Sequence, residues 1–122
     1  MIEIRKALNP FLKSLHPRVY FNQAPQTAVF PYLKYDLQMY PDGEGGELVT
    51  LEVDGWDSNT AGDPMPVELL MDSLKALDKK TLSTDLITVT FFLENRLTVE
   101  DDNKDIKHRK YSYAGNLIRR DY

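Results

Sequence analysis

The stretch at residues 32–40, YLKYDLQMY, decides the fold, because its residues alternate between apolar and polar. The apolar positions are Leu33, Tyr35, Leu37 and Met39. Successive side chains of a strand point to opposite faces, so this pattern predicts a strand with one buried face and one wet face.

A partner for this strand follows closely. Residues 41–46, PDGEGG, break regular structure and are expected to form a flexible connector. Residues 47–57 then alternate again, with Val49, Leu51 and Val53 on one side. Two alternating runs joined by a short glycine-rich segment predict an antiparallel hairpin.

Upstream of the hairpin, residues 2–15 predict a helix, since apolar residues recur every three or four positions. Pro10 lacks a backbone N–H and crowds the preceding turn. We therefore expect a kink near residues 7–10, or a helix that begins only at Asn9. Residues 18–21, RVYF, are rich in strand formers and predict a short strand.

Downstream of the hairpin, the pattern predicts one more helix and two more strands. Pro66 precedes an apolar stripe from Val67 to Leu77, and two lysines follow where the helix dipole is negative. The expected elements are a polar loop at 58–65, this helix, a strand at 85–94, a flexible acidic loop at 95–105, a strand at 106–114 and a basic tail at 116–122.

These elements predict a single α+β domain over residues 1–122. A chain of 122 residues is too short for two domains that each bury an adequate core. We expect an antiparallel or mixed sheet of four to five strands with two helices packed on one face.

Charge is distributed unevenly along the chain, whose formal net charge is −4. Residues 1–35 carry five bases and one acid, residues 36–105 five bases and seventeen acids, and residues 106–122 five bases and one acid. The acidic middle would repel a polyanion. The pattern is that of a solvated surface, or of a protein that meets its neighbours through oppositely charged faces.

The composition also bears on location. The chain contains no cysteine, which fits a reducing compartment. Its apolar runs are short, so no segment is expected to span a membrane. The N-terminus lacks a hydrophobic signal core, so export is not indicated.

Residue chemistry offers no recognisable active site. Two histidines without cysteine do not make a typical zinc site. Residues 101–105 resemble the start of a calcium loop, but Ile106 and Ser112 stand where glycine and glutamate are needed. The glycines at 43–46 lack the Lys-Ser/Thr ending of a phosphate loop. We therefore expect no catalytic residue, no metal and no cofactor.

Two alternative functions remain open at this point. Asp54 and Asp57 flank Trp56, and a small ligand-binding or enzymatic domain using this region would need a concave pocket there. The aromatic residues between Tyr20 and Tyr40 could instead stack on single-stranded nucleic acid, which predicts salt-sensitive binding.

Several short motifs also occur in a recognisable order. Residues 18–25, RVYFNQAP, are followed by FPYLKY at 30–35 and by VDGWD at 53–57. Their order and spacing resemble the tail completion and head–tail joining proteins of long-tailed bacteriophages, which are relatives of the tail terminator family. The similarity covers roughly residues 4–114, but Gly55 and residues 95–105 have no counterpart in that pattern.

The resemblance implies a structural role without enzymatic activity. Such proteins form a ring, commonly a hexamer, that caps the tail tube and joins it to the head connector or stopper, and DNA passes through the ring without specific binding. The chain is then expected at the head–tail junction of a virion assembled in bacterial cytoplasm. It is expected to be monomeric or ring-shaped in solution and to need no membrane.

Two sets of residues follow as interface hypotheses. Rigid or amphipathic residues and C-terminal bases are predicted to contact neighbouring subunits or partners, at Tyr20, Pro25, Tyr32, Trp56, Arg119 and Arg120. Acids are predicted to line the lumen or the joining surface, where they would repel DNA, at Asp42, Glu44, Glu47, Glu100, Asp101 and Asp102.

Overall fold

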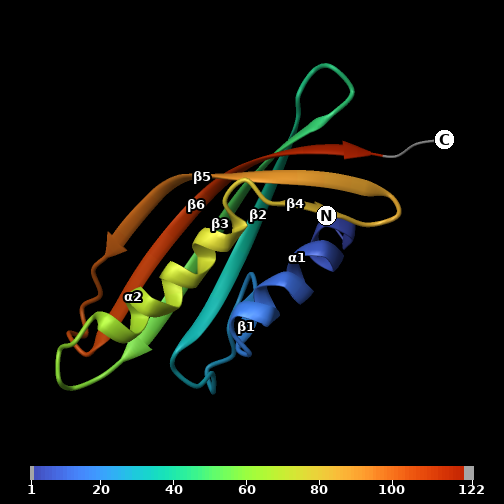
Figure 1. The fold of residues 1–122 in the computed structure, drawn as a ribbon. Helices are drawn as coiled ribbons and strands as arrows, with labels where there is room; N and C mark the ends of the chain where they lie inside the picture. The colour runs from blue at the N-terminus through green and yellow to red at the C-terminus, as the bar shows by residue number, and fades with distance from the viewer. Residues whose placement is uncertain (1, 120–122) are drawn as a thin grey trace.

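A computed structural model describes residues 2–119 of the chain. These residues form two α-helices, one short 3-10 helix and six strands (Figure 1). In chain order the elements are α1 (Ile2–Leu15), β1 (Val19–Phe21), β2 (Tyr32–Pro41), β3 (Glu47–Ser58), α2 (Met65–Asp72), η1 (Ser73–Leu77), β4 (Thr81–Ser83), β5 (Ile87–Val99) and β6 (Ile106–Arg119).

The six strands form one sheet in the order β1-β2-β3-β6-β5-β4. β1 is parallel to β2, and every other neighbouring pair is antiparallel, so the sheet is mixed. The predicted α+β class is confirmed, but the predicted count of four to five strands is at least one short. The three residues of β4 are too few to show an alternating pattern in the sequence.

β2 and β3 form the predicted antiparallel hairpin, in which Tyr32 lies opposite Trp56. The side chain of Asp42 shapes the connecting turn. Its Oδ1 accepts hydrogen bonds from the backbone N–H groups of Glu44 (2.7 Å) and Gly46 (3.0 Å). One of the acids expected at a lumen or joining surface is thus also a structural part of its own turn.

Helix α1 begins at Ile2, so the alternative in which it begins at Asn9 is wrong. Pro10 lies inside the helix on its exposed side. The opposite stripe is fully buried, at Ile4, Leu8 and Leu12. Burial of three large apolar side chains outweighs the one backbone hydrogen bond that proline removes.

The second predicted helix is shorter and changes type. α2 ends at Asp72, and the chain tightens into the 3-10 helix η1. The apolar stripe faces the core as predicted, through Val67, Leu70, Met71, Leu74 and Leu77. Periodicity identified the buried side of this segment but did not reveal where the helix tightens.

β5 is longer than the predicted strand and ends at Val99. The flexible loop expected at residues 95–105 is therefore wrong for residues 95–99. A register shift between Leu93 and Asn95 marks a bulge, after which the pairing with β6 continues as far as His108. The bulge reverses the alternation within β5, so no continuous strand pattern is visible in the sequence.

β6 also extends beyond its predicted end, to Arg119. The basic tail expected at residues 116–122 is wrong for residues 116–119, whereas residues 120–122 lie outside the described part of the chain. β6 pairs with β3 on one side and with β5 on the other. Residues 116–119 therefore pair with neighbouring strands. The basic charge on which the predicted tail was based does not indicate such pairing.

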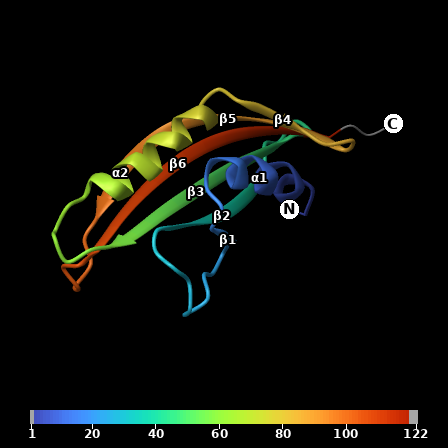
Figure 2. The same cartoon turned by 60° about the horizontal axis from the view of Figure 1, so that its bottom comes forward.

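One face of the sheet carries the core, and both α-helices pack on it as predicted (Figures 1 and 2). Two buried tyrosines of the sheet form hydrogen bonds with the helical layer. The Tyr35 hydroxyl donates to Asn9 Oδ1 (2.5 Å), and the Tyr113 hydroxyl donates to the carbonyl of Leu74 (2.8 Å). The opposite face of the sheet, called the open face below, carries no helix among residues 2–119.

The Tyr113 hydroxyl provides a test of this packing. Burial raises the pKa of the Tyr113 phenol above its ordinary value, and the nearby Tyr111 and Asp78 add to the shift. In the unfolded chain the same phenol ionises near pH 10, so its contribution to stability is complete below that pH and decreases as the pH rises above it.

We predict that Tyr113→Phe lowers the free energy of unfolding by about 1 kcal/mol near neutral pH, because it removes a buried hydrogen bond. The difference from the unmodified protein should shrink above about pH 10. Urea titrations followed by tryptophan fluorescence measure both effects. Tyr40→Phe, which changes an exposed hydroxyl, is the control and should have no effect. A difference that stays constant across this pH range would contradict the prediction.

Candidate functional site

The open face of the sheet gathers four of the residues that the sequence singled out, Tyr20, Tyr32, Asp54 and Trp56. On β3, Asp54 and Trp56 alternate with the core residues Val53 and Gly55 and so point away from the helices. Tyr32 on β2 and His108 on β6 lie opposite Trp56 in the two ladders. The pairing of the strands therefore places distant residues of the sequence in one row.

The row consists of stacked rings. Tyr32 and Trp56 stack with ring centroids 5.3 Å apart and planes inclined by 27°. Trp56 and His108 stack more closely, with centroids 4.1 Å apart and planes inclined by 22°. Such pairs contribute stability beyond the area that they bury. The row thus fixes the positions of side chains on three neighbouring strands.

Two further rings extend the row beyond β2. The rings of Tyr20 on β1 and Tyr32 form a T-shaped pair with centroids 5.8 Å apart, and the ring centroid of Phe30 lies 5.4 Å from that of Tyr32. Because these rings contact one another, the faces of Tyr32 and Trp56 are already occupied by neighbours within the chain. Base stacking needs a free ring face, so the arrangement does not favour the single-stranded nucleic acid alternative.

A charged cluster lies beside the aromatic row. Asp54 is only 3% exposed, and its Oδ1 accepts a hydrogen bond from His108 Nε2 at 2.7 Å. Lys110 Nζ lies 3.9 Å from the same oxygen and 3.1 Å from Glu52 Oε2. The hydrogen bond to Glu52, opposed by partial burial and aided by Asp54, raises the pKa of the Lys110 ammonium. The buried carboxylate is therefore held between two cationic or donor side chains.

The structure separates the two carboxylates of the ligand-binding alternative. Asp54 lies on the open face, whereas Asp57, three residues later, is buried on the helix side, where Asn59 Nδ2 donates to its Oδ2 (3.2 Å). They cannot act on one substrate as a pair. Five cavities in the described part of the chain are lined by other residues, and none of the five includes Asp54, Trp56 or Asp57.

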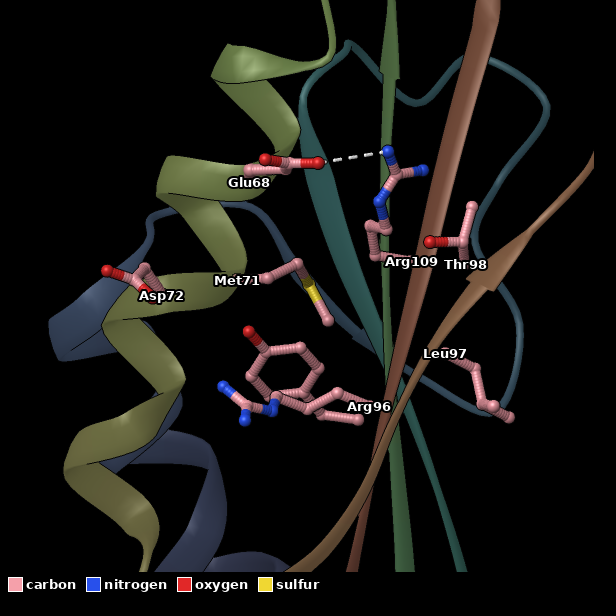
Figure 3. A pocket seen from close by; sticks show the side chains of 8 residues that line it. Glu68, Met71, Asp72, Arg96, Leu97, Thr98 and Arg109 are labelled. Atoms are coloured by element: carbon pink, nitrogen blue, oxygen red, sulfur yellow. Dashed lines mark hydrogen bonds and ion pairs between the residues drawn. The ribbon is translucent and has the colours of Figure 1, made fainter.

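One such cavity lies between α2 and the β5–β6 pair and has a volume of about 200 Å³ (Figure 3). Arg109 spans part of it, since its Nη2 donates to Glu68 Oε1 at 3.2 Å. Sequence reasoning did not indicate this site, because its residues come from segments far apart in the chain. The lining residues are Glu68, Met71, Asp72, Arg96, Leu97, Thr98, Arg109 and Tyr111.

The six predicted lumen acids fall into two separate groups. Asp42, Glu44 and Glu47 lie at or next to the β2–β3 turn. Glu100, Asp101 and Asp102 lie in the β5–β6 turn, at the opposite end of the sheet (Figure 1). They therefore cannot form one continuous acidic patch within a single copy of the chain.

The remaining predicted contact residues lie apart from the aromatic row. Pro25 is exposed in the segment between β1 and β2. Arg119 ends β6 and binds Glu47 of β3, with Nη2 to Oε1 at 2.7 Å, so a predicted interface base and a predicted lumen acid pair with each other. Arg120 lies outside the described residues.

Residues 2–119 contain no group of three or more His, Asp or Glu side chains placed to hold a metal ion. No helix in that range is long and apolar enough to cross a membrane.

Comparison with known proteins finds no matching family model and no matching curated protein. Solved structures do share the fold. A chain from the virion of a native gene transfer agent (GTA) particle aligns with a TM-score of 0.69 and 12% identity, over 95% of this chain and 92% of that one. A second structure, whose name states no function, aligns with a TM-score of 0.72 and 14% identity, over 99% and 93%. The TM-scores establish a common fold, and at identities this low the similarity shows the fold alone.

The buried hydrogen bond of the open face can be measured by a double-mutant cycle. For Asp54→Ala, His108→Ala and the double variant, we predict a coupling of about 1–3 kcal/mol in the free energy of unfolding, since both side chains are largely desolvated. The more exposed pair Lys34 and Asp36 is the control and should couple by less than about 1 kcal/mol. Equal coupling in both cycles would show that the buried pair has no special role.

Proposed function

We propose that this protein is a structural subunit of a phage-like virion and that it acts without chemical turnover. The observation that carries the proposal is the fold, which is shared over 95% of the chain with a component of a gene transfer agent particle. The order of motifs at residues 18–57 independently resembles that of phage tail completion proteins. Two unrelated kinds of comparison thus indicate the same class of protein.

In the finer form of the proposal, copies of the chain form a ring, expected to be a hexamer, at the head–tail junction. The ring caps the tail tube, joins it to the connector or stopper of the head and lets DNA pass. Closed rings need a contact between two different surfaces of the same chain. Acids and bases are unevenly distributed along the sequence, but Lys110 and Arg119 pair with Glu52 and Glu47 within one copy, so only the remaining charges could distinguish two such surfaces.

The aromatic row of the open face is the proposed contact with a neighbouring component. Tyr20, Tyr32 and Trp56 are half-buried within one chain and lie on a sheet face without a helix layer. Large amphipathic rings held rigidly by their neighbours lose little side-chain entropy when a partner covers them. Pro25, in the segment that joins β1 to β2, would contribute at the periphery of such a contact. Arg119 lies at the other end of β6, opposite Ile87, and would belong to a different contact.

The first test is deletion of the gene from the phage or element that encodes it. We predict tails of uncontrolled length, or mature tails that fail to attach to filled heads, because the junction lacks its cap. Electron microscopy of the particles and their DNA-transfer titre measure this outcome. Complementation with the intact chain is the control. Full-titre particles assembled in its absence would contradict the proposed role.

The second test concerns the acids at the β5–β6 turn. We propose that Glu100 and Asp102 face the DNA path or the joining surface. Asp101 is kept unchanged in the test, because its Oδ1 accepts a hydrogen bond from the backbone N–H of Asn103 (2.9 Å) and so shapes the turn.

We predict that Glu100→Lys with Asp102→Lys leaves folding intact and lowers DNA delivery by about tenfold or more, because added positive charge retains the passing polyanion. The matched control is Asp72→Lys with Asp85→Lys, which reverses two exposed acids elsewhere and should leave delivery unchanged. Particle counts and transfer titres are compared for both variants. Unchanged delivery by the first variant would remove these acids from the proposed surface.

A further inference from the structure

The two edges of the sheet are only partly covered. On one edge, residues around η1 and β4 form hydrogen bonds with the outward-pointing backbone groups of β5 as far as Leu93. The backbone N–H of Lys79 donates to the carbonyl of Phe91 (2.7 Å), and the N–H of Leu93 donates to Asp78 Oδ1 (2.8 Å). From Glu94 to Val99, no strand of residues 2–119 lies on the outer side of β5.

The other edge shows the same arrangement. β1 pairs with β2 only at residues 33–35, and the N–H of Asn22 closes this short ladder on the carbonyl of Tyr35 (2.8 Å). Within the described residues, β2 is therefore without a neighbour on this side at residues 36–41. The sheet thus has two six-residue free edges, one on each side.

Both free edges carry features suited to pairing. Leu97 on β5 is 45% exposed and Tyr40 on β2 is 49% exposed, and both lie on the open face. Side chains at each edge line a hollow, of about 350 Å³ at Glu94–Arg96 and about 300 Å³ at Asp36–Gln38. Folded proteins usually block such edges with proline, charge or a covering segment. Charged residues and a proline stand at Glu94, Arg96, Asp36 and Pro41, but residues 97–99 of β5 and 37–40 of β2 carry neither charge nor proline.

We infer that the two free edges are complementary parts of one contact, in which β5 residues 94–99 of one copy pair with β2 residues 36–41 of a second copy. The choice of a second copy as the occupant rests on the ring proposed above. Each contact uses one edge of each copy and leaves the other edge free, so addition continues until a ring closes.

Topology fixes the direction of the pairing. β2 is antiparallel to β3, β3 to β6 and β6 to β5, so β5 runs opposite to β2. If the open faces of both copies stay on the same side, the shared ladder is antiparallel. In an antiparallel ladder, residues directly opposite each other lie on the same face of the sheet. One register brings all six positions of the two edges opposite each other and keeps open-face residues on the open face. It puts Leu97 opposite Gln38 and Asn95 opposite Tyr40.

The same register implies a stagger between copies. Within one copy, Leu97 pairs with Lys110, Lys110 with Asp54 and Asp54 with Lys34, so Leu97 and Lys34 lie at the same height along the strands. Gln38 is four positions further along β2, which corresponds to a shift of about 13 Å along the strands. A ring built from staggered copies closes only if its strands are inclined to the ring axis, as in a barrel.

The absence of native cysteine makes the contact directly testable. Gln38→Cys and Leu97→Cys are purified separately, mixed at high concentration and oxidised, and the products are resolved on a non-reducing gel. We expect about tenfold more disulfide-linked dimer in the mixture than in either variant alone, because paired strands hold the two thiols close. Leu97→Cys mixed with Leu69→Cys, an exposed position on α2, is the matched control.

The outcomes separate the alternatives. A link that forms equally well in Leu97→Cys alone would mean that two β5 edges pair symmetrically, which overturns the proposed head-to-tail contact. Absence of any link above the control, in the concentrated protein and in assembled particles carrying both substitutions in one chain, would overturn it as well. Neither result changes the outcome expected when the gene is deleted. Failure of this contact is therefore distinguishable from failure of the proposed virion role.

Discussion

The backbone pairing of β3 with β6 is the constraint on which the rest of the structure depends. Twelve consecutive residue pairs join these strands, and both lie inside the sheet with a partner on their other side. Because side chains alternate along each strand, this one register decides which residues enter the core and which face outward. A shift by one residue would exchange Val53 and Tyr111 for Asp54 and Lys110 in the core.

The same register builds the open face. Tyr32, Trp56 and His108 come from three strands and meet only because their positions coincide across two ladders. Asp54 is nearly buried beside them, and the same pairing places His108 and Lys110 next to its carboxyl group. The helices on the opposite face supply the apolar layer that keeps the sheet in this form.

An arrangement of this kind fits the contact proposed for this protein. Its distinctive residues lie on a sheet face and at sheet edges, and the predicted carboxylate pair is divided between two faces. A gene transfer agent virion chain shares the fold, and a fold by itself does not define a function. The role proposed for this protein therefore depends on its surfaces and on the partners that cover them.

The sequence by itself determined the elements whose pattern is local. The alternation at residues 32–40 and 47–57 predicted the central hairpin, and the stripe of Ile4, Leu8 and Leu12 predicted which side of α1 is buried. These signals are strong because a strand or a helix repeats within a few residues.

Tertiary structure alone decided the features that depend on a distant partner. Residues 95–99 follow a bulge that reverses the alternation of β5, and it is their pairing with β6 that places them in the sheet. The end of β6, the stacking of Trp56 on His108 and the separation of the acids into two groups arise in the same way. Each is set by hydrogen bonds between residues far apart in the chain, and no local pattern encodes such a register.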